Sequence, residues 1–485
     1  MTAPPDPRDQ RIADLEALVT RLLAKIDAQE KRLAEQDARI AELEAQLRQN
    51  SRNSSKPPSS DPPGTPPRRS DPTGRKPGGQ PGHKGTKRDL VAPEQVDVFV
   101  KVAAEKCERC ESHLIKRVGA PEARRHQVTE LPTVKPHVTE YQLQYGYCRE
   151  CDDWTCASLP SGVPEGSFGP RLTAFVSLCT GRFRLSKRQT RDLLGDAFGV
   201  DVALGSISNL EQTVSAALAA PVEEARAFVR RQPTVHQDET GWWEGKARAW
   251  LWVATTSLVA VFSIVRSRGK EVAKQMLGEH FAGTLVSDRW CAYNWVDVLR
   301  RQVCWAHLLR EFEGFLERGG EAKRIGELLL SEAFVMFEWW HHARDGTIKR
   351  STFRKKMQPL MGEVEQLLAE GAVCPDVKVA GTCREILKLA DALWTFVYVE
   401  DVPPTNNLAE QDLRHAVIWR KTSFGTNSVD GSRFVERILT AAMSLRKQKR
   451  NVLDYLTAAC EAALRGGASP SLLPAAAHQL TVAAA

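Results

Sequence analysis

The segment Thr234-Val-His-Gln-Asp-Glu-Thr240 opens the part of the sequence that decides the fold. Two further segments follow it closely, Ala249-Trp-Leu-Trp-Val-Ala-Thr-Thr256 and Leu258-Val-Ala-Val-Phe-Ser-Ile-Val265. All three are rich in β-branched or aromatic residues, which are typical of strands. Their short connections predict three consecutive strands.

Helices and strands follow in alternation. We expect a helix near Lys270–Glu279, a strand at Gly283–Arg289, a short strand around Arg301–Trp305 and a helix that runs through Leu316. Residues 320–400 are predicted to be mostly helical and inserted before the final helices. This order predicts a mixed α/β sheet covered by helices.

Three carboxylates stand where such a sheet would bring them together. Asp238 lies near the end of the first strand, and Asp288 ends the fourth. Glu410 lies on a helix that two prolines and an Asn cap begin, and its face also carries Asn407, Arg414 and Lys421. A few carboxylates suffice for Mg²⁺, and two such ions about 4 Å apart can catalyse in-line displacement at phosphorus. The alternatives are that the aspartates are ordinary turn residues and that Glu410 only pairs with Arg414.

The eleven cysteines include two Cys-x-x-Cys pairs, Cys107 with Cys110 and Cys148 with Cys151. Each pair has the spacing of a zinc knuckle. In a long chain without a secretory signal, this usage favours reduced thiols and Zn²⁺ over disulfides. Strand-like runs at 127–134 and 138–147 predict a small zinc-ribbon-like module around the two pairs.

A pair of short helices is predicted before the strands. Residues 185–199 predict a helix capped at Ser186, and a second helix begins near Ser206. This arrangement fits a helix-turn-helix, although any two paired helices give the same pattern. Within it, Lys187 and Arg188 are candidates for DNA contact.

Residues 9–49 carry a heptad repeat of apolar residues. One seam holds Ile12, Val19, Ile26, Leu33, Ile40 and Leu47, and the other includes Leu15, Leu22 and Leu43. The repeat predicts a coiled coil that joins copies of the chain. The alternative is a single amphipathic helix packed on its own chain, but no neighbouring apolar segment is available to cover the stripe.

Most of the net charge of +7 lies in one segment. Residues 51–90 carry nine Lys and Arg against three Asp and Glu, together with nine Pro and six Gly. This composition predicts an extended basic linker, which is either a solvated tether or a strand that lies along DNA phosphates. No apolar run reaches the ~18 residues of a membrane span, and no secretory signal is visible, so we expect a cytoplasmic protein without a membrane partner.

Several motifs resemble the insertion sequence 66 family of bacterial transposases. They are Asp238-Glu-Thr-Gly-Trp242, Val286-Ser-Asp-Arg-Trp-Cys-Ala-Tyr-Asn294, Cys304-Trp-Ala-His-Leu-Leu-Arg310 and Asn406-Asn-Leu-Ala-Glu-Gln-Asp-Leu-Arg414. The heptads, the segments Asn53–Asp61 and Gly79–Gly85, and the paired Cys-x-x-Cys motifs resemble the family in the same order. The similarity covers essentially residues 10–460.

The resemblance implies a multidomain α/β protein with an RNase-H-like catalytic core. Its DDE triad, carried over by motif, is Asp238, Asp288 and Glu410. The implied activity is cleavage at transposon ends with Mg²⁺ or Mn²⁺, followed by attack of a 3′-hydroxyl on target DNA. Accessory transposition proteins and a place on the bacterial nucleoid are also implied. The alternatives are a non-catalytic DNA-binding protein with zinc and helix-turn-helix modules, and an RNase-H-like nuclease without strand transfer.

The expected domains follow in chain order: a coiled-coil helix (1–50), a basic linker (51–94), a zinc module (95–160), a helix-turn-helix-like region (165–230), a catalytic domain (231–425) with a helical insertion at about 320–400, and a C-terminal helical region with an Ala-rich tail (426–485).

DNA contacts are expected from Arg414, Arg420, Lys421, His307, Arg310, Lys187 and Arg188. Cys304 and His307 have metal-like spacing, but without a second pair we expect His307 near the site, in the core or facing DNA. We expect Glu239 to point to the opposite strand face from Asp238.

Overall fold

The fold is described from a computed structural model, which describes residues 7–47, 49–50, 61, 88–115, 119 and 122–474. Most of the predicted basic linker and the Ala-rich tail lie outside the described residues. The chain divides into two compact units. One comprises residues 66–138 with 197–199, and the other comprises the rest of the chain.

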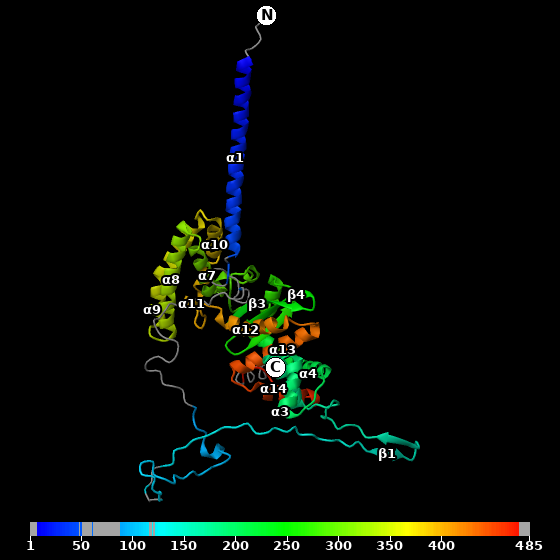
Figure 1. Cartoon of the computed structure of the whole chain (residues 1–485). Coiled ribbons are helices and arrows are strands. Elements are labelled where there is room, and N and C mark those ends of the chain that lie inside the picture. Colours follow the sequence, from blue (N-terminus) through cyan, green and yellow to red (C-terminus); the bar gives the residue numbers. More distant parts are fainter. Residues whose placement is uncertain are drawn as a thin grey trace. The chain divides into compact units, whose positions relative to one another are not determined.

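The larger unit contains the predicted mixed sheet (Figure 1). Strands β3 (Thr234–Glu244), β4 (Ala247–Thr255) and β5 (Ala260–Val265) are successive antiparallel neighbours. On the other side of β3, strands β6 (Thr284–Ser287) and β7 (Arg301–Val303) run parallel to it, in the order β5-β4-β3-β6-β7. The prediction of a mixed α/β sheet is confirmed, and β3 lies at its centre.

The helices also agree closely with the sequence pattern. Those before the sheet are α2 (Pro170–Ser177), the π-helical turn η3 (Leu178–Arg182), α3 (Lys187–Phe198), α4 (Leu204–Ala217) and α5 (Ala219–Val229). Between strands lie α6 (Lys270–Leu277), η4 (Cys291–Tyr293) and η5 (Val298–Arg300). The inserted region holds α7 (Trp305–Leu316), α8 (Gly320–Arg344), α9 (Arg350–Ala372), α10 (Val377–Leu387), η6 (Asp391–Leu393) and α11 (Thr395–Tyr398). The last helices are α12 (Asn407–Ser423), α13 (Val429–Lys447) and α14 (Val452–Leu464).

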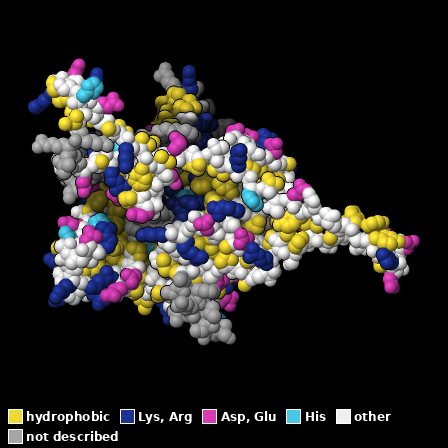
Figure 2. Space-filling model, turned by 90° about the horizontal axis from the view of Figure 1, so that it is seen from below, with side chains coloured by type: hydrophobic (Ala, Val, Ile, Leu, Met, Phe, Trp, Pro, Cys, Tyr) yellow, Lys and Arg dark blue, Asp and Glu magenta, His cyan; other side chains and the backbone are white. Residues whose placement is uncertain are grey.

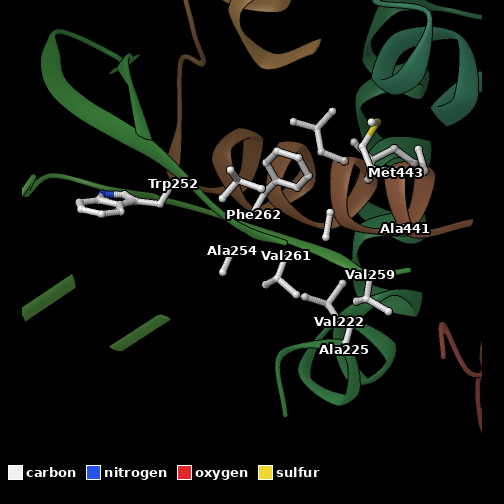
Figure 3. Packing of buried hydrophobic residues seen from close by; sticks show 14 of the residues in the cluster. Val222, Ala225, Trp252, Ala254, Val259, Val261, Phe262, Ala441 and Met443 are labelled. Atoms are coloured by element: carbon white, nitrogen blue, oxygen red, sulfur yellow. The ribbon is translucent and has the colours of Figure 1, made fainter. Parts of the chain in front are cut away.

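The hydrophobic core covers both faces of the sheet. Along β5, Phe262 lies on the side of α13, which carries Ala441 and Met443, whereas Val261 lies on the side of α5 (Figure 3). This alternation is the two-residue period of a strand whose faces are both buried. A second cluster of buried residues holds the inserted helices together.

Helix α13 covers the edge of the sheet. Its Ser444 accepts a hydrogen bond from the backbone N–H of Ala260 at 3.1 Å, and its Thr440 accepts one from Phe262 at 3.0 Å. The accepting residues are four apart on the helix and the donating residues are two apart on the strand. These two spacings cover nearly the same length, so the acceptors and donors stay aligned. The otherwise free donors of edge strand β5 are satisfied in this way, which protects the edge from pairing with another chain.

The connection after α12 is fixed by one glycine. Gly425 has a φ of +117°, and an added Cβ would lie 2.2 Å from the carbonyl oxygen of Trp243. The next residue, Thr426, donates its backbone N–H to that same oxygen at 2.9 Å. Only glycine permits this approach, which ties the end of α12 to the end of β3.

The N-terminal elements are α1 (Pro7–Leu47), η2 (Pro93–Gln95) and the antiparallel hairpin of β1 (Tyr145–Cys148) and β2 (Asp153–Cys156). The heptad residues of α1 are exposed in the single chain, including Ile12 at 54% and Leu33 at 57%. The expected strand at 127–134 is wrong, and the one at 138–147 is confined to its last residues, because the extended segments have no partner strand there. No described helix is long and apolar enough to cross a membrane.

Candidate active site

Asp238 lies on β3, and Asp288 directly follows β6, the parallel neighbour of β3. The prediction that Asp238 lies near the end of its strand is wrong, because β3 continues to Glu244 in its pairing with β4. β3 pairs with β6 in a register that places His236 opposite Val286. Each aspartate follows its member of that pair by two residues, which restores the same face of the pleat. Continued past the last paired residues, this register would bring the two aspartates side by side, and the charge of Asp288 does act on Asp238.

Asn406 brings the third carboxylate to this place. Its side chain is fully buried, donates to the backbone oxygen of Gln237 at 2.9 Å and lies 3.1 Å from Nδ1 of His236. The sequence predicts that an Asn caps this helix, but the Asn406 side chain makes no capping bond. It ties the start of α12 to β3 instead, so Glu410, in the first turn, lies near the aspartates.

The site has an excess of negative charge. Burial raises the pKa of Asp238 well above its usual range, and the charges of Glu239, Asp288 and Glu410 raise it further. Carboxylates that share a site repel one another unless a cation lies between them. The arrangement therefore fits a divalent cation, for which carboxylate oxygens are suitable ligands.

Two buried atoms support this fit. Oε1 of Glu410 and Nδ1 of His307 lie 3.6 Å apart, and neither has a hydrogen-bond partner among the described residues. Possible ligand atoms of Cys304, His307 and Glu410 all lie within 4.8 Å of one another. Buried polar atoms are almost always satisfied, so these two atoms point to a bound group.

His307, which the sequence predicts to lie near the site in the core or facing DNA, is a neighbour of the carboxylates. Burial works against a charge on its ring, yet Cys304 and Asp288 raise its pKa to about 10. A protonated imidazole thus balances part of the negative charge. A metal ion would compete with that proton, because a histidine ligates in its neutral form.

Arginines complete the surroundings of the carboxylates. Arg310 lies with Nη2 at 3.7 Å from Oε2 of Glu410 and is largely buried. Arg301, on β7, is 1% exposed and donates to the backbone oxygen of Asp288 at 2.7 Å. Arg310 is thus beside the site, where it would offset charge on a phosphate.

Glu239 does not share the position of Asp238. It is buried, pairs with Arg268 at 2.8 Å and accepts a hydrogen bond from the hydroxyl of Tyr293. Arg268 in turn lies over the ring of Trp290, with 4.0 Å between its guanidinium carbon and the ring centroid. The sequence pattern does not predict the contacts of Glu239 with Arg268 and Tyr293, because these residues come from separate segments.

Apart from His307 and Arg310, which lie beside Glu410, the residues expected to contact DNA fall into two groups. Arg188, Arg414 and Lys421 are exposed. In contrast, Lys187 is held by Ser208 and by Glu211, and Arg420 donates to Thr240 at 3.1 Å and to the backbone oxygen of Gly241. Lys and Arg side chains gather near the middle of one face of the molecule (Figure 2).

Each Cys-x-x-Cys pair lies in a tight turn. An isolated bridge between Lys106 and His113 encloses the first pair, and the second pair lies where β1 turns into β2. Hydrogen bonds lower the pKa of Cys110, through Ser112, and that of Cys148, through the backbone of Cys151. The pairs belong to different compact units, so the four-cysteine zinc site stays a prediction.

The chain has a five-stranded mixed sheet covered by helices, which fits the class of proteins with an RNase-H-like core. The family described as Transposase IS66 matches residues 165–433, more than half of the chain. The chain belongs to this family. A second family, of unknown function, matches residues 2–89. No curated protein matches the chain. Membership implies an enzyme that cleaves DNA, with DNA as its partner.

Proposed function

We propose that this transposase cleaves DNA at the ends of its element and joins them to target DNA, with Asp238, Asp288 and Glu410 as its catalytic residues. One observation carries the proposal. The charges of Asp288 and Glu410 act on Asp238, which supports the three carboxylates that the family resemblance marks as one site.

The three carboxylates would hold two divalent ions such as Mg²⁺ or Mn²⁺. When bound, such ions activate the attacking oxygen and stabilise the leaving oxygen of a phosphodiester. Arg310 is placed to offset charge on the phosphate beside Glu410. His307 would lose its proton as the ions bind, and buried Asn406 keeps the helix from moving away from the strand.

The remaining modules fit the same function. The exposed heptads of α1 would pair two copies of the chain and so hold two transposon ends together. Zn²⁺ at Cys107, Cys110, Cys148 and Cys151 would order the segment before the helix pair α3 and α4, which would contact the ends. The protein would act on nucleoid DNA, alone or with accessory transposition proteins.

The test uses the purified full-length protein, Mg²⁺ and a plasmid that carries the element's ends. Asp238→Asn, Asp288→Asn and Glu410→Gln are each expected to slow cleavage by about 10²–10³-fold, the effect of losing one group that stabilises the transition state. Glu338→Gln, which neutralises an exposed carboxylate of α8, is the matched control and should cleave normally.

The outcomes separate the alternatives. Cleavage with joining, lost in the three variants, supports the proposal. Cleavage without joining indicates a nuclease that lacks strand transfer. DNA binding without cleavage indicates a non-catalytic DNA-binding protein and contradicts the proposal.

A further inference from the structure

A cluster of arginines surrounds His415 on a face of α12 distinct from that of Glu410. Nη1 of Arg184 lies 3.2 Å from Nδ1 of His415, and Nη1 of Arg446 lies 3.3 Å from its Nε2. Arg182 lies at the end of η3, near Arg446. Burial and the charge of Arg446 lower the pKa of Arg182. Two segments, residues 182–184 and α13, thus bring positive charge to one imidazole on α12.

The hydrogen bonds within this cluster are incomplete. A neutral imidazole has one acceptor nitrogen and one donor N–H, so it can accept from only one of the two arginines. A protonated imidazole can accept from neither. Burial and the charges of Arg446, Arg184 and Arg182 lower the pKa of His415, which favours the neutral ring. Several guanidinium donors are therefore left over, and they point to an acceptor with negative charge.

No carboxylate of the described residues forms an ion pair with Arg182, Arg184 or Arg446. Asp412 is the acidic group whose charge acts on His415, but it is already paired. Lys447 lies 3.0 Å from it and Thr255 donates to it at 2.7 Å. Lys447 is thus paired with a carboxylate, whereas the adjacent Arg446 has no carboxylate partner among the described residues.

The backbone holds the arginines in place at some cost. Arg184 has a φ of +61°, which residues with a side chain rarely adopt. The preceding Gly181 packs so closely on Ile438 of α13 that an added Cβ would lie 2.5 Å from its Cγ1. This contact fixes η3 against α13, and strained residues that the surroundings hold in place are frequent at binding sites.

We propose that Arg182, Arg184, Arg446 and His415 bind one phosphodiester group of the DNA backbone. Guanidinium groups match phosphate oxygens in bidentate geometry, and the exposed Arg446 leaves the cluster open to a polymer. His415 follows Glu410 by five residues, which is about 140° around the helix. The bound phosphate therefore belongs to a different stretch of DNA from the one at the carboxylates, and it contributes to affinity instead of chemistry.

The inference rests on the proposed function, since it needs a protein that binds DNA. The test measures binding of a duplex with the element's end sequence to the full-length protein over a range of salt concentrations. The site variant is the double substitution Arg184→Gln with Arg446→Gln. The control is the double substitution Arg171→Gln with Arg344→Gln, which removes two exposed arginines that are paired with carboxylates. Arg446→Glu alone is a second variant at an exposed position, where folding is not at stake.

The slope of log K against log salt should fall by about 0.9 in the site variants, the loss of one phosphate contact, and stay unchanged in the control. The cleavage rate at saturating protein should stay unchanged in all of them. Equal slopes in site variant and control would overturn the inference. A second result would also overturn it: inorganic phosphate stabilises the wild type but not the site variant, and the slopes of the two are equal. The cluster would then bind the free anion and not DNA. A wild-type protein that binds no DNA would overturn the proposed function itself.

Discussion

Two stretches of α12 carry opposite excess charges. In its first turn, Glu410 joins carboxylates whose repulsion helps to raise the pKa of Asp238. Five residues later, His415 lies between arginines that no described carboxylate neutralises. Between them, Asp412 and Lys447 form a buried ion pair at 3.0 Å. The Asp412–Lys447 pair shows that this fold neutralises a buried charge with a partner of opposite sign. The excess negative charge near Glu410 therefore indicates a cation ligand, and the excess positive charge around His415 indicates an anion ligand.

The largest effect is expected at the balanced pair. Lys447→Met leaves Asp412, which is 5% exposed, without its partner, and should lower the free energy of unfolding by about 3–5 kcal/mol. Urea denaturation measures this. Arg171→Met breaks an exposed pair and should cost about 0–1 kcal/mol. Equal losses in the two variants would contradict the claim that this fold depends on balancing its buried charges.

A smaller effect is expected at Asn406, which connects the carboxylate end of α12 to the sheet. Asn406→Ala removes its bonds to Gln237 and His236 and should reduce cleavage by about 10–100-fold, as for other residues that orient metal ligands. Asn407→Ala, at the exposed neighbour, is the control. Normal cleavage by Asn406→Ala would show that Glu410 is positioned in another way.

The fold of the catalytic region was largely predictable, whereas the ties within the site were not. Strand and helix periodicities are local, so β3 to α7 follow the expected boundaries closely. The tie of Asn406 to His236 joins residues 170 positions apart, and no local pattern encodes it. The expected strand at 127–134 failed for the converse reason, because its local pattern has no partner to pair with.

The same limit applies to the charged residues. Arg420 belongs to a basic helix end and was expected to contact DNA, but the structure directs its guanidinium to Thr240 and Gly241 of β3. The arginines around His415 come from two segments, neither of which is notable alone. Only the folded chain distinguishes a cation that the protein itself uses from one that is left for a ligand.

The smallest effect is expected at the exposed cations of α12. Arg414→Gln and Lys421→Gln should each lower the slope of log K against log salt by at most about 0.9, and should change stability by less than about 0.5 kcal/mol. Fluorescence anisotropy with labelled duplex measures the slope. A loss of stability in either variant would indicate a structural role like that of Arg420.

The central claim, that Asp238, Asp288 and Glu410 together hold divalent metal, is tested most directly by Mn²⁺ binding to the folded protein. Titration followed by electron paramagnetic resonance, without DNA, reports bound and free Mn²⁺ independently of activity. We predict that wild-type protein binds Mn²⁺ and that Asp238→Asn with Glu410→Gln abolishes this binding, while Glu338→Gln does not. Equal Mn²⁺ binding by the wild type and the double variant would contradict the account.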